Sequence, residues 1–263
     1  MLRHSYVLLL AFVACGGLAG PSDQSQIVGS FFVTTGADVD TFAAELQPYV
    51  NQSSSTSACP GATMVVGSCC PFPAPRPPPF LGVGDGGAGG PAVPELSAGS
   101  LTFSDGTTSA TVSTFGFGDG LYEGVPATYP AGAWQPGDTL TVSAAGDQID
   151  AFTISAPALV PPAPSFPSAL SLSESLTVAW QPDPNADTIA VSFDDASGAV
   201  VECTVPDAQG KVTFDASLFT EYASGASLQA SAQRQTQREI TTPNGRIVLE
   251  TFGWGSNVFV SAK

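Results

Sequence analysis

Short runs of alternating apolar and polar residues, bounded by turn residues, dominate the chain from Gly99 onward and restrict what it can fold into. Four such runs lie at 101–103, 110–112, 140–142 and 152–154. Turn pairs stand among them, namely Asp105-Gly106, Gly137-Asp138 and Gly146-Asp147. Alternation buries one face of a strand and leaves the other in water. Short alternating strands joined by turns therefore predict an all-β chain built as an antiparallel sandwich.

Residues 168–263 continue this pattern around Trp180. One predicted strand carries Leu176, Val178 and Trp180 on a single face, and the next carries Ile189, Val191 and Phe193. Later strands are predicted at 200–205, 211–214, 228–232, 246–251 and 258–260. The two strands resemble the second and third strands of a fibronectin type III or related immunoglobulin-like domain, which has about 100 residues. This resemblance implies a second antiparallel sandwich with Trp180 as its core anchor.

Residues 27–157 are predicted to form the first of the two sandwiches, with a strand at 27–35. Asp38 or Asp40 is expected to cap a short helix that runs to Leu46, because a carboxylate accepts early helical N–H groups. Another strand is expected at 62–70.

Two proline-rich segments interrupt the strands. Residues 71–94 are expected to form a loop, extended at first and loose at its Gly-rich end, for which a spacer is favoured over a partner-binding polyproline segment. Residues 158–167 are the predicted linker between the two sandwich domains.

Cysteines are the second constraint on the fold. Neighbouring Cα atoms lie about 3.8 Å apart, closer than the roughly 4.4 to 6.8 Å that disulfides prefer, so a Cys69-Cys70 bond is disfavoured. Cys59 is therefore expected to pair with one of them, while Cys203 either pairs with the other or stays a buried thiol. No basic or histidine residue stands nearby in the sequence to activate a thiolate, which favours a structural role for all four.

The N-terminus combines Arg3 with an apolar run that ends at Cys15. The run is shorter than the about 20 residues of a membrane-spanning helix, and it predicts an export signal. It resembles a bacterial lipoprotein signal peptide. The resemblance implies removal of residues 1–14, acylation of Cys15, a flexible tether over 15–26, and anchoring at the outer membrane or cell surface. An ordinary secretory signal, cleaved near Ala19 or Gly20, is the alternative.

Charge and histidine content exclude several functions. After residues 1–14 are removed, all 23 acids and six of the seven basic residues remain, so the formal charge is near −17. Such a chain repels nucleic acid, and attachment to a membrane is expected to come from acyl chains. The one histidine, His4, leaves with the signal peptide. Nucleophile–histidine pairs and histidine-ligated metals are thereby excluded from the mature protein.

Two motifs suggest binding sites. Asp183, Asn185 and Asp187 have the oxygen spacing of a calcium loop, but Thr188 stands where that loop needs glycine, so a solvated turn is the favoured interpretation. The aromatic-glycine stretches 115–120 and 252–255 suggest rings that stack on a sugar. Packing of these rings across the sandwich is the favoured interpretation, with glycine permitting bulges.

These observations predict a non-catalytic envelope lipoprotein that presents sandwich modules for binding or structural roles. No cofactor, metal or catalytic residue is expected. The sequence leaves open whether the partner is a protein or a carbohydrate. The alternative is a carboxylate-dependent hydrolase of envelope or extracellular polymer, for which no pattern selects a pair of acids.

Overall fold

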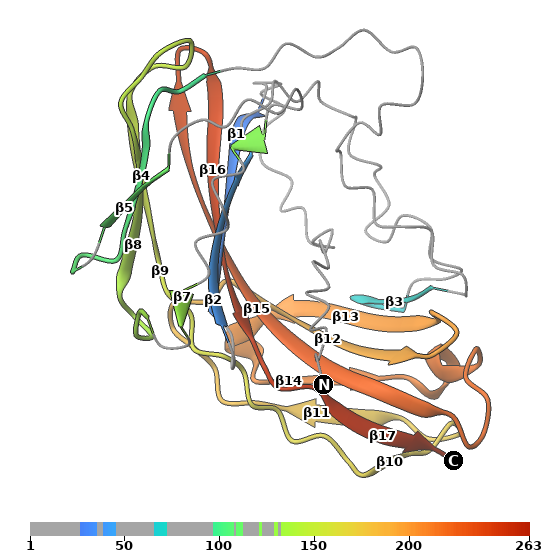
Figure 1. Ribbon diagram of the computed structural model, residues 1–263. Helices are drawn as coiled ribbons and strands as arrows, with labels where there is room; N and C mark the ends of the chain where they lie inside the picture. Colours follow the sequence, from blue (N-terminus) through green and yellow to red (C-terminus); the bar gives the residue numbers. More distant parts are fainter. Residues whose placement is uncertain are drawn as a thin grey trace, which may run out of the picture.

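The computed structural model describes residues 27–35, 39–45, 66–72, 97–107, 109–112, 121–122, 129–130 and 133–263 (Figure 1). Strands make up the regular structure of these ranges, apart from two short 3-10 helices, η1 (Asp207–Gln209) and η2 (Ala216–Phe219). No helix in these ranges is long and apolar enough to cross a membrane. The predicted all-β class is confirmed.

The largest sheet has 11 strands and runs through both halves of the molecule (Figure 1). Its main path is β3 (Cys69–Phe72), β13 (Val200–Pro206), β12 (Thr188–Asp195), β15 (Ser227–Thr242), β16 (Gly245–Trp254), β1 (Ile27–Thr35), β2 (Val39–Glu45) and β6 (Leu121–Tyr122). Off this path lie β7 (Tyr129–Pro130), β10 (Ala169–Leu170) and β17 (Val258–Ala262). The 16-residue β15 connects the two halves, since it pairs with β12 and β17 at one end and with β16 at the other.

Two smaller sheets pack against separate parts of the large one. The four-stranded sheet has the order β5 (Ser109–Val112), β4 (Leu101–Ser104), β8 (Thr139–Ala144) and β9 (Phe152–Pro157). Together with β1 and β16 it encloses the first core, which includes Phe31, Phe103, Leu140 and Leu249. The two-stranded sheet of β11 (Leu176–Ala179) and β14 (Lys211–Phe214) covers the second core, which includes Val178, Val191 and Phe214.

The strands do not follow the predicted domain boundary at 158–167. β1 pairs in parallel with β16 from Ile27 to Thr35, and β3 pairs with β13, so segments on both sides of the boundary share one sheet. The linker itself is held in place, because Ala158 and Leu159 are fully buried. One continuous sheet thus serves both of the large cores.

Two N-terminal predictions are corrected. The segment expected to be a helix after Asp38 or Asp40 is the strand β2, which pairs with Ser30–Thr34 of β1. Its β-branched and aromatic residues favour a strand, and pairing with β1 outweighs the helix signal of a capping acid. Of the strand expected at 62–70, the structure describes residues 66–70: Gly67 takes a positive φ of 63° in a turn, and β3 starts after this turn, at Cys69.

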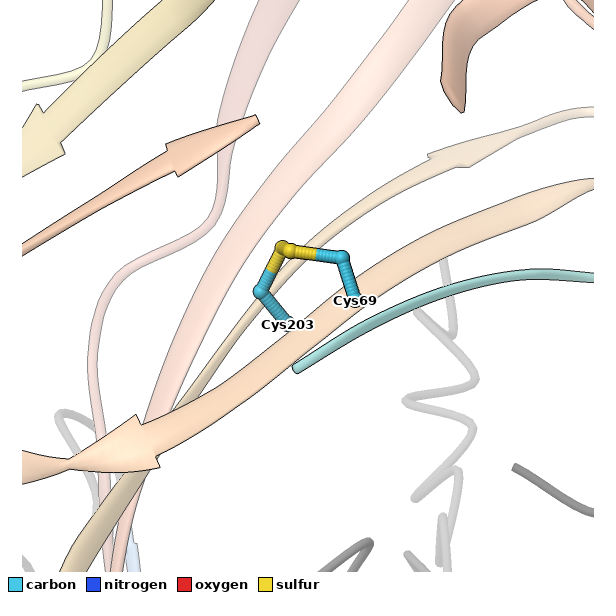
Figure 2. Close-up of a disulfide and its surroundings, with 2 residues drawn as sticks. All are labelled: Cys69 and Cys203. Carbon is cyan, nitrogen blue, oxygen red and sulfur yellow. A yellow bond between two sulfur atoms is a disulfide. The ribbon is translucent and has the colours of Figure 1, made fainter. Parts of the chain in front are cut away.

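A disulfide joins Cys69 on β3 to Cys203 on β13 (Figure 2). The two residues lie directly opposite each other in the strand pair and are separated by 134 residues in the sequence. Cys69 faces the second core, whereas Cys70 packs with Phe72 and Val200 on the other face of the sheet. Cys70 is also disulfide-bonded. Its expected partner Cys59 lies outside the described residues, as do Cys15 and residues 73–96.

Candidate functional site on strands β15 and β16

One face of β15 is polar along most of its length. Even-numbered residues Leu228, Ala230 and Ala232 point into the second core. Odd-numbered residues point to the opposite face, which belongs to neither core, because side chains alternate along a strand. They include four glutamines, here called the glutamine row, namely Gln229, Gln233, Gln235 and Gln237.

Three of these glutamines lie directly opposite aromatic residues. Gln235 pairs with Phe252 and Gln233 with Trp254 across the β15–β16 ladder. Gln229 pairs with Phe259 on β17. Directly opposite residues share a face of the sheet and contact each other. The glutamine row therefore lies beside a row of rings, of which Phe259 is 72% exposed.

The rings of the 252–255 stretch were expected to pack across the sandwich, and in the described part of the chain they lie outside both large cores. Phe252 and Trp254 belong to neither core and are half-buried on the opposite face. The intervening glycines explain this arrangement. A Cβ on Gly253 would lie 2.9 Å from the Val160 carbonyl oxygen, and one on Gly255 would collide with the Pro162 carbonyl. The linker backbone thus occupies the core side of β16, and the rings occupy the other side. The 115–120 stretch lies outside the described residues.

Glu250 lies at the end of this face, opposite Gln237. Burial raises its pKa from the ordinary 4.5 to about 7, although a hydrogen bond from the Gln235 amide opposes the shift. The Gln235 Nε2 donates to Glu250 Oε2 over 3.3 Å. Near neutral pH the carboxyl is therefore divided between its neutral and charged forms, and the neutral form both donates and accepts hydrogen bonds.

Replacing Glu250 with glutamine is expected to remove part of the pH dependence of stability. The Glu250 carboxyl has a pKa of about 7 in the folded state and about 4.5 in the unfolded state, so between these values the folded state binds more protons. The free energy of unfolding of wild type therefore falls as the pH rises from about 4.5 to about 7. The shift corresponds to about 3 kcal/mol. Urea unfolding at pH 5 and pH 8 should show this loss in wild type and a smaller one in Glu250→Gln. Glu221→Gln, at an exposed acid, should behave as wild type. Identical pH profiles for wild type and Glu250→Gln would contradict the assignment.

The calcium candidates do not form a shared site. Asp183 is 4% exposed and accepts hydrogen bonds from the backbone N–H groups of Val160, at 2.9 Å, and of Asn185, at 3.0 Å. Asp187 instead accepts from Thr236 and, at 3.0 Å, from Arg238. The favoured interpretation of a solvated turn is wrong for Asp183, which is buried at the junction with the linker. Within the described ranges, no three His, Cys, Asp or Glu side chains are placed to hold a metal ion.

A buried ion pair lies beside Asp183, and it was not predicted from the sequence. Arg234 and Asp207 are 3% and 0% exposed, and Arg234 Nε donates to Asp207 Oδ1 over 2.9 Å. Arg234 also donates to the carbonyl oxygens of Val160, at 2.9 Å, and of Gln181. The other Asp207 oxygen accepts from the Asp183 N–H. This junction cluster of Asp183, Asp207 and Arg234 ties the linker, the β11–β12 turn and η1 to β15.

The signal for the junction cluster was present in the sequence. Arg234 has the same parity as Leu228, Ala230 and Ala232, so a strand places it on the buried side. A charge there needs a buried partner. Because the described contacts use the charged atoms of the cluster internally, its role is structural.

Comparison with known proteins gives no relative on which to base a function. No protein-family model matches the chain, and no significant match is found among curated proteins. The functional argument therefore depends on the residues themselves.

Proposed function

We propose that this chain is a lipid-anchored protein of the bacterial cell envelope that presents β-sandwich modules for binding at the outer membrane or cell surface. The apolar segment that ends at Cys15 supports the anchor. The Cys69–Cys203 disulfide supports export, because disulfides persist in oxidising compartments outside the cytosol.

The second sandwich is proposed to be immunoglobulin-like or fibronectin type III-like. In support, β11 pairs with β14, while β13, β12, β15 and β17 are neighbours in the facing sheet. The tyrosine corner of such domains finds no support, since the Tyr222 hydroxyl donates to the Phe193 carbonyl 29 residues upstream. Continuation of the sheet into β16 and β1 is also foreign to that pattern.

The observation that carries the binding role is the glutamine row with its opposite rings. At the end of the row Phe259 is 72% exposed and lies opposite the half-buried Gln229, so a ring and an amide are accessible together there. Polar groups beside aromatic rings are typical of binding sites.

A carboxylate-dependent hydrolase is the second candidate, and Glu250 favours it as a general acid. Hydrolysis of a glycoside needs a second carboxylate beside the first. The side chain that hydrogen-bonds Glu250 in the described part of the chain is the Gln235 amide. We therefore place binding before hydrolysis.

The anchor is tested by Cys15→Ser. Wild type is expected in the detergent phase of a Triton X-114 separation and the variant in the aqueous phase, because two or more acyl chains give stable membrane attachment. Ser22→Ala in the tether is the matched control and should remain in the detergent phase. Mass spectrometry of the N-terminal peptide should show acyl chains on wild type. Wild-type protein in the aqueous phase would show that the chain is not lipid-anchored.

A further inference from the structure

We propose that Asp187 and Arg238 close an exposed edge of β15 and so keep the chain from pairing, strand against strand, with a second copy of itself. The inference is independent of the proposed binding role, because it concerns the edge of the large sheet and not one of its faces.

The exposed edge begins where β12 ends. β12 pairs with residues 228–235 of β15, whereas β15 continues to Thr242 along β16 (Figure 1). In the described part of the chain, no strand pairs with β15 beyond residue 235 on the side of β12. Gln237, Glu239 and Thr241 are exposed there. Residues 237–241 on this side are here called the β15 edge.

The backbone groups of alternate residues point to the β15 edge. In an antiparallel strand, the N–H and C=O groups of one residue point to the same side, and every second residue repeats this direction. The Gln235 C=O accepts from the Asp187 N–H over 3.0 Å, on the side of β12. The N–H and C=O groups of Gln237, Glu239 and Thr241 therefore point the same way. A row of this kind is a template for an added strand.

Two charged side chains occupy the first position of this row. The Gln237 N–H donates to Asp187 Oδ2 over 3.1 Å, and the Gln237 C=O accepts from Arg238 Nη1 over 2.8 Å. Arg238 Nη1 also donates to Asp187 Oδ2 over 3.0 Å, which joins the two side chains across the edge. Asp187 thus takes the place that a longer β12 would fill. An incoming strand has to displace both charged groups to pair with Gln237.

The rest of the β15 edge is short. After Gln237, only Glu239 and Thr241 present outward backbone groups before Pro243, which has no N–H. Two pairing residues are fewer than the about 3 to 10 residues of ordinary strands. The pair of Asp187 and Arg238 therefore removes the one position that would make the edge long enough for stable pairing.

A second copy of the chain fits the unprotected edge. When two β15 strands run antiparallel with Glu239 opposite its own counterpart, Gln237 lies opposite Thr241, and all three residues exchange hydrogen bonds. Like charges at the centre are compensated, since Arg246 Nε donates to Glu239 Oε1 over 2.6 Å. The edge is thus self-complementary once Gln237 is free.

The test is sedimentation velocity of the full mature chain with Cys15→Ser, which has no acyl chains, over a series of concentrations. This background chain should stay monomeric. Asp187→Ala/Arg238→Met should form dimers, with a dissociation constant at least about tenfold lower. Arg238→Met alone leaves Asp187 on the Gln237 N–H and should associate more weakly than the double variant. Urea unfolding verifies the fold of each variant, and Arg238→Met decides the matter if the double variant does not fold.

Two further variants separate edge pairing from a change in charge. Glu239→Ala/Arg246→Met removes another ion pair of the same hairpin with the same change in charge, but leaves Gln237 covered, and should stay monomeric. Thr241→Pro, added to Asp187→Ala/Arg238→Met, deletes an N–H that points to the β15 edge and should restore the monomer.

Three results would overturn the proposal. The first is a folded Asp187→Ala/Arg238→Met, or a folded Arg238→Met where the double variant does not fold, that associates no more tightly than the background chain. The second is dimer formation by Glu239→Ala/Arg246→Met to the same extent. The third is a dimer that persists after Thr241→Pro, because such a dimer does not form through the β15 edge.

Discussion

Arg234→Met is expected to destabilise the folded chain by about 3 to 5 kcal/mol. The substitution keeps much of the side-chain volume but leaves the Asp207 carboxylate buried beside no cation. It also removes the donors to the carbonyl oxygens of Val160 and Gln181. Breaking one member of a buried ion pair costs far more than the pair itself contributes, because the remaining charge stays desolvated.

A matched control lies four residues along the same strand. Arg238 donates to Asp187 over 3.0 Å, but the two side chains are 41% and 53% exposed. Arg238→Met should therefore cost less than about 1 kcal/mol. Urea unfolding followed by circular dichroism compares the two variants at equal charge. If both variants lose the same stability, the buried charges of the junction cluster do not hold the linker against β15.

Strand positions were predictable because burial of one face leaves a local signature. The alternation at 101–103, 140–142 and 152–154 is that of β4, β8 and β9, whose inward residues line the first core. The later strands predicted at 200–205, 211–214 and 258–260 likewise lie within β13, β14 and β17. The apolar pattern of each strand is set by its own residues, so it can be recognised without knowing which strand it pairs with.

Strand partners were not predictable, because pairing is decided far away in the sequence. β1 pairs with β16, which lies more than 200 residues further along the chain. Nothing in the sequence of residues 27–35 indicates which strand will be its partner. The same limit explains β2, whose capping acid signals a helix while β1 offers a strand to pair with. As a strand, β2 pairs with the backbone N–H and C=O groups of β1, which would otherwise be left unpaired along that edge.

The candidate site was half predictable. Odd-numbered glutamines in a strand already share a face, so the glutamine row follows from the alternation of 228–232 extended to 237. The rings opposite them depend on the register of β15 with β16 and β17. Their direction depends on the linker backbone that fills the space beside Gly253.

Trp180 was predicted to lie in a strand whose inward face adjoins that of Ile189, Val191 and Phe193. The structure shows a different neighbour for the strand before Trp180. β11 pairs with β14, and β12 lies in the facing sheet, so these side chains meet across the core rather than along one sheet. Trp180 remains a core residue, because it is 7% exposed and its indole N–H donates to the Asp207 carbonyl over 2.9 Å.

Trp180→Ala is accordingly expected to cost about 3 to 5 kcal/mol, from lost contact surface and the cavity left between the sheets. That is a large part of the about 5 to 15 kcal/mol by which a domain is stable. Trp180→Phe should cost less, since it keeps most of the packing and removes only the donor to Asp207. The two variants separate packing from hydrogen bonding.

The same variant tests whether the two sandwiches unfold together. Two independent domains would show two transitions, with only that of residues 168–263 shifted by Trp180→Ala. A sheet that β15 and β16 carry through both cores should instead transmit the loss. The junction cluster adds to this coupling, because Asp207 contacts both Trp180 and Arg234. Differential scanning calorimetry of Trp180→Ala should therefore show one transition at lower temperature. An unshifted second transition would mean that the first core is stable without the second.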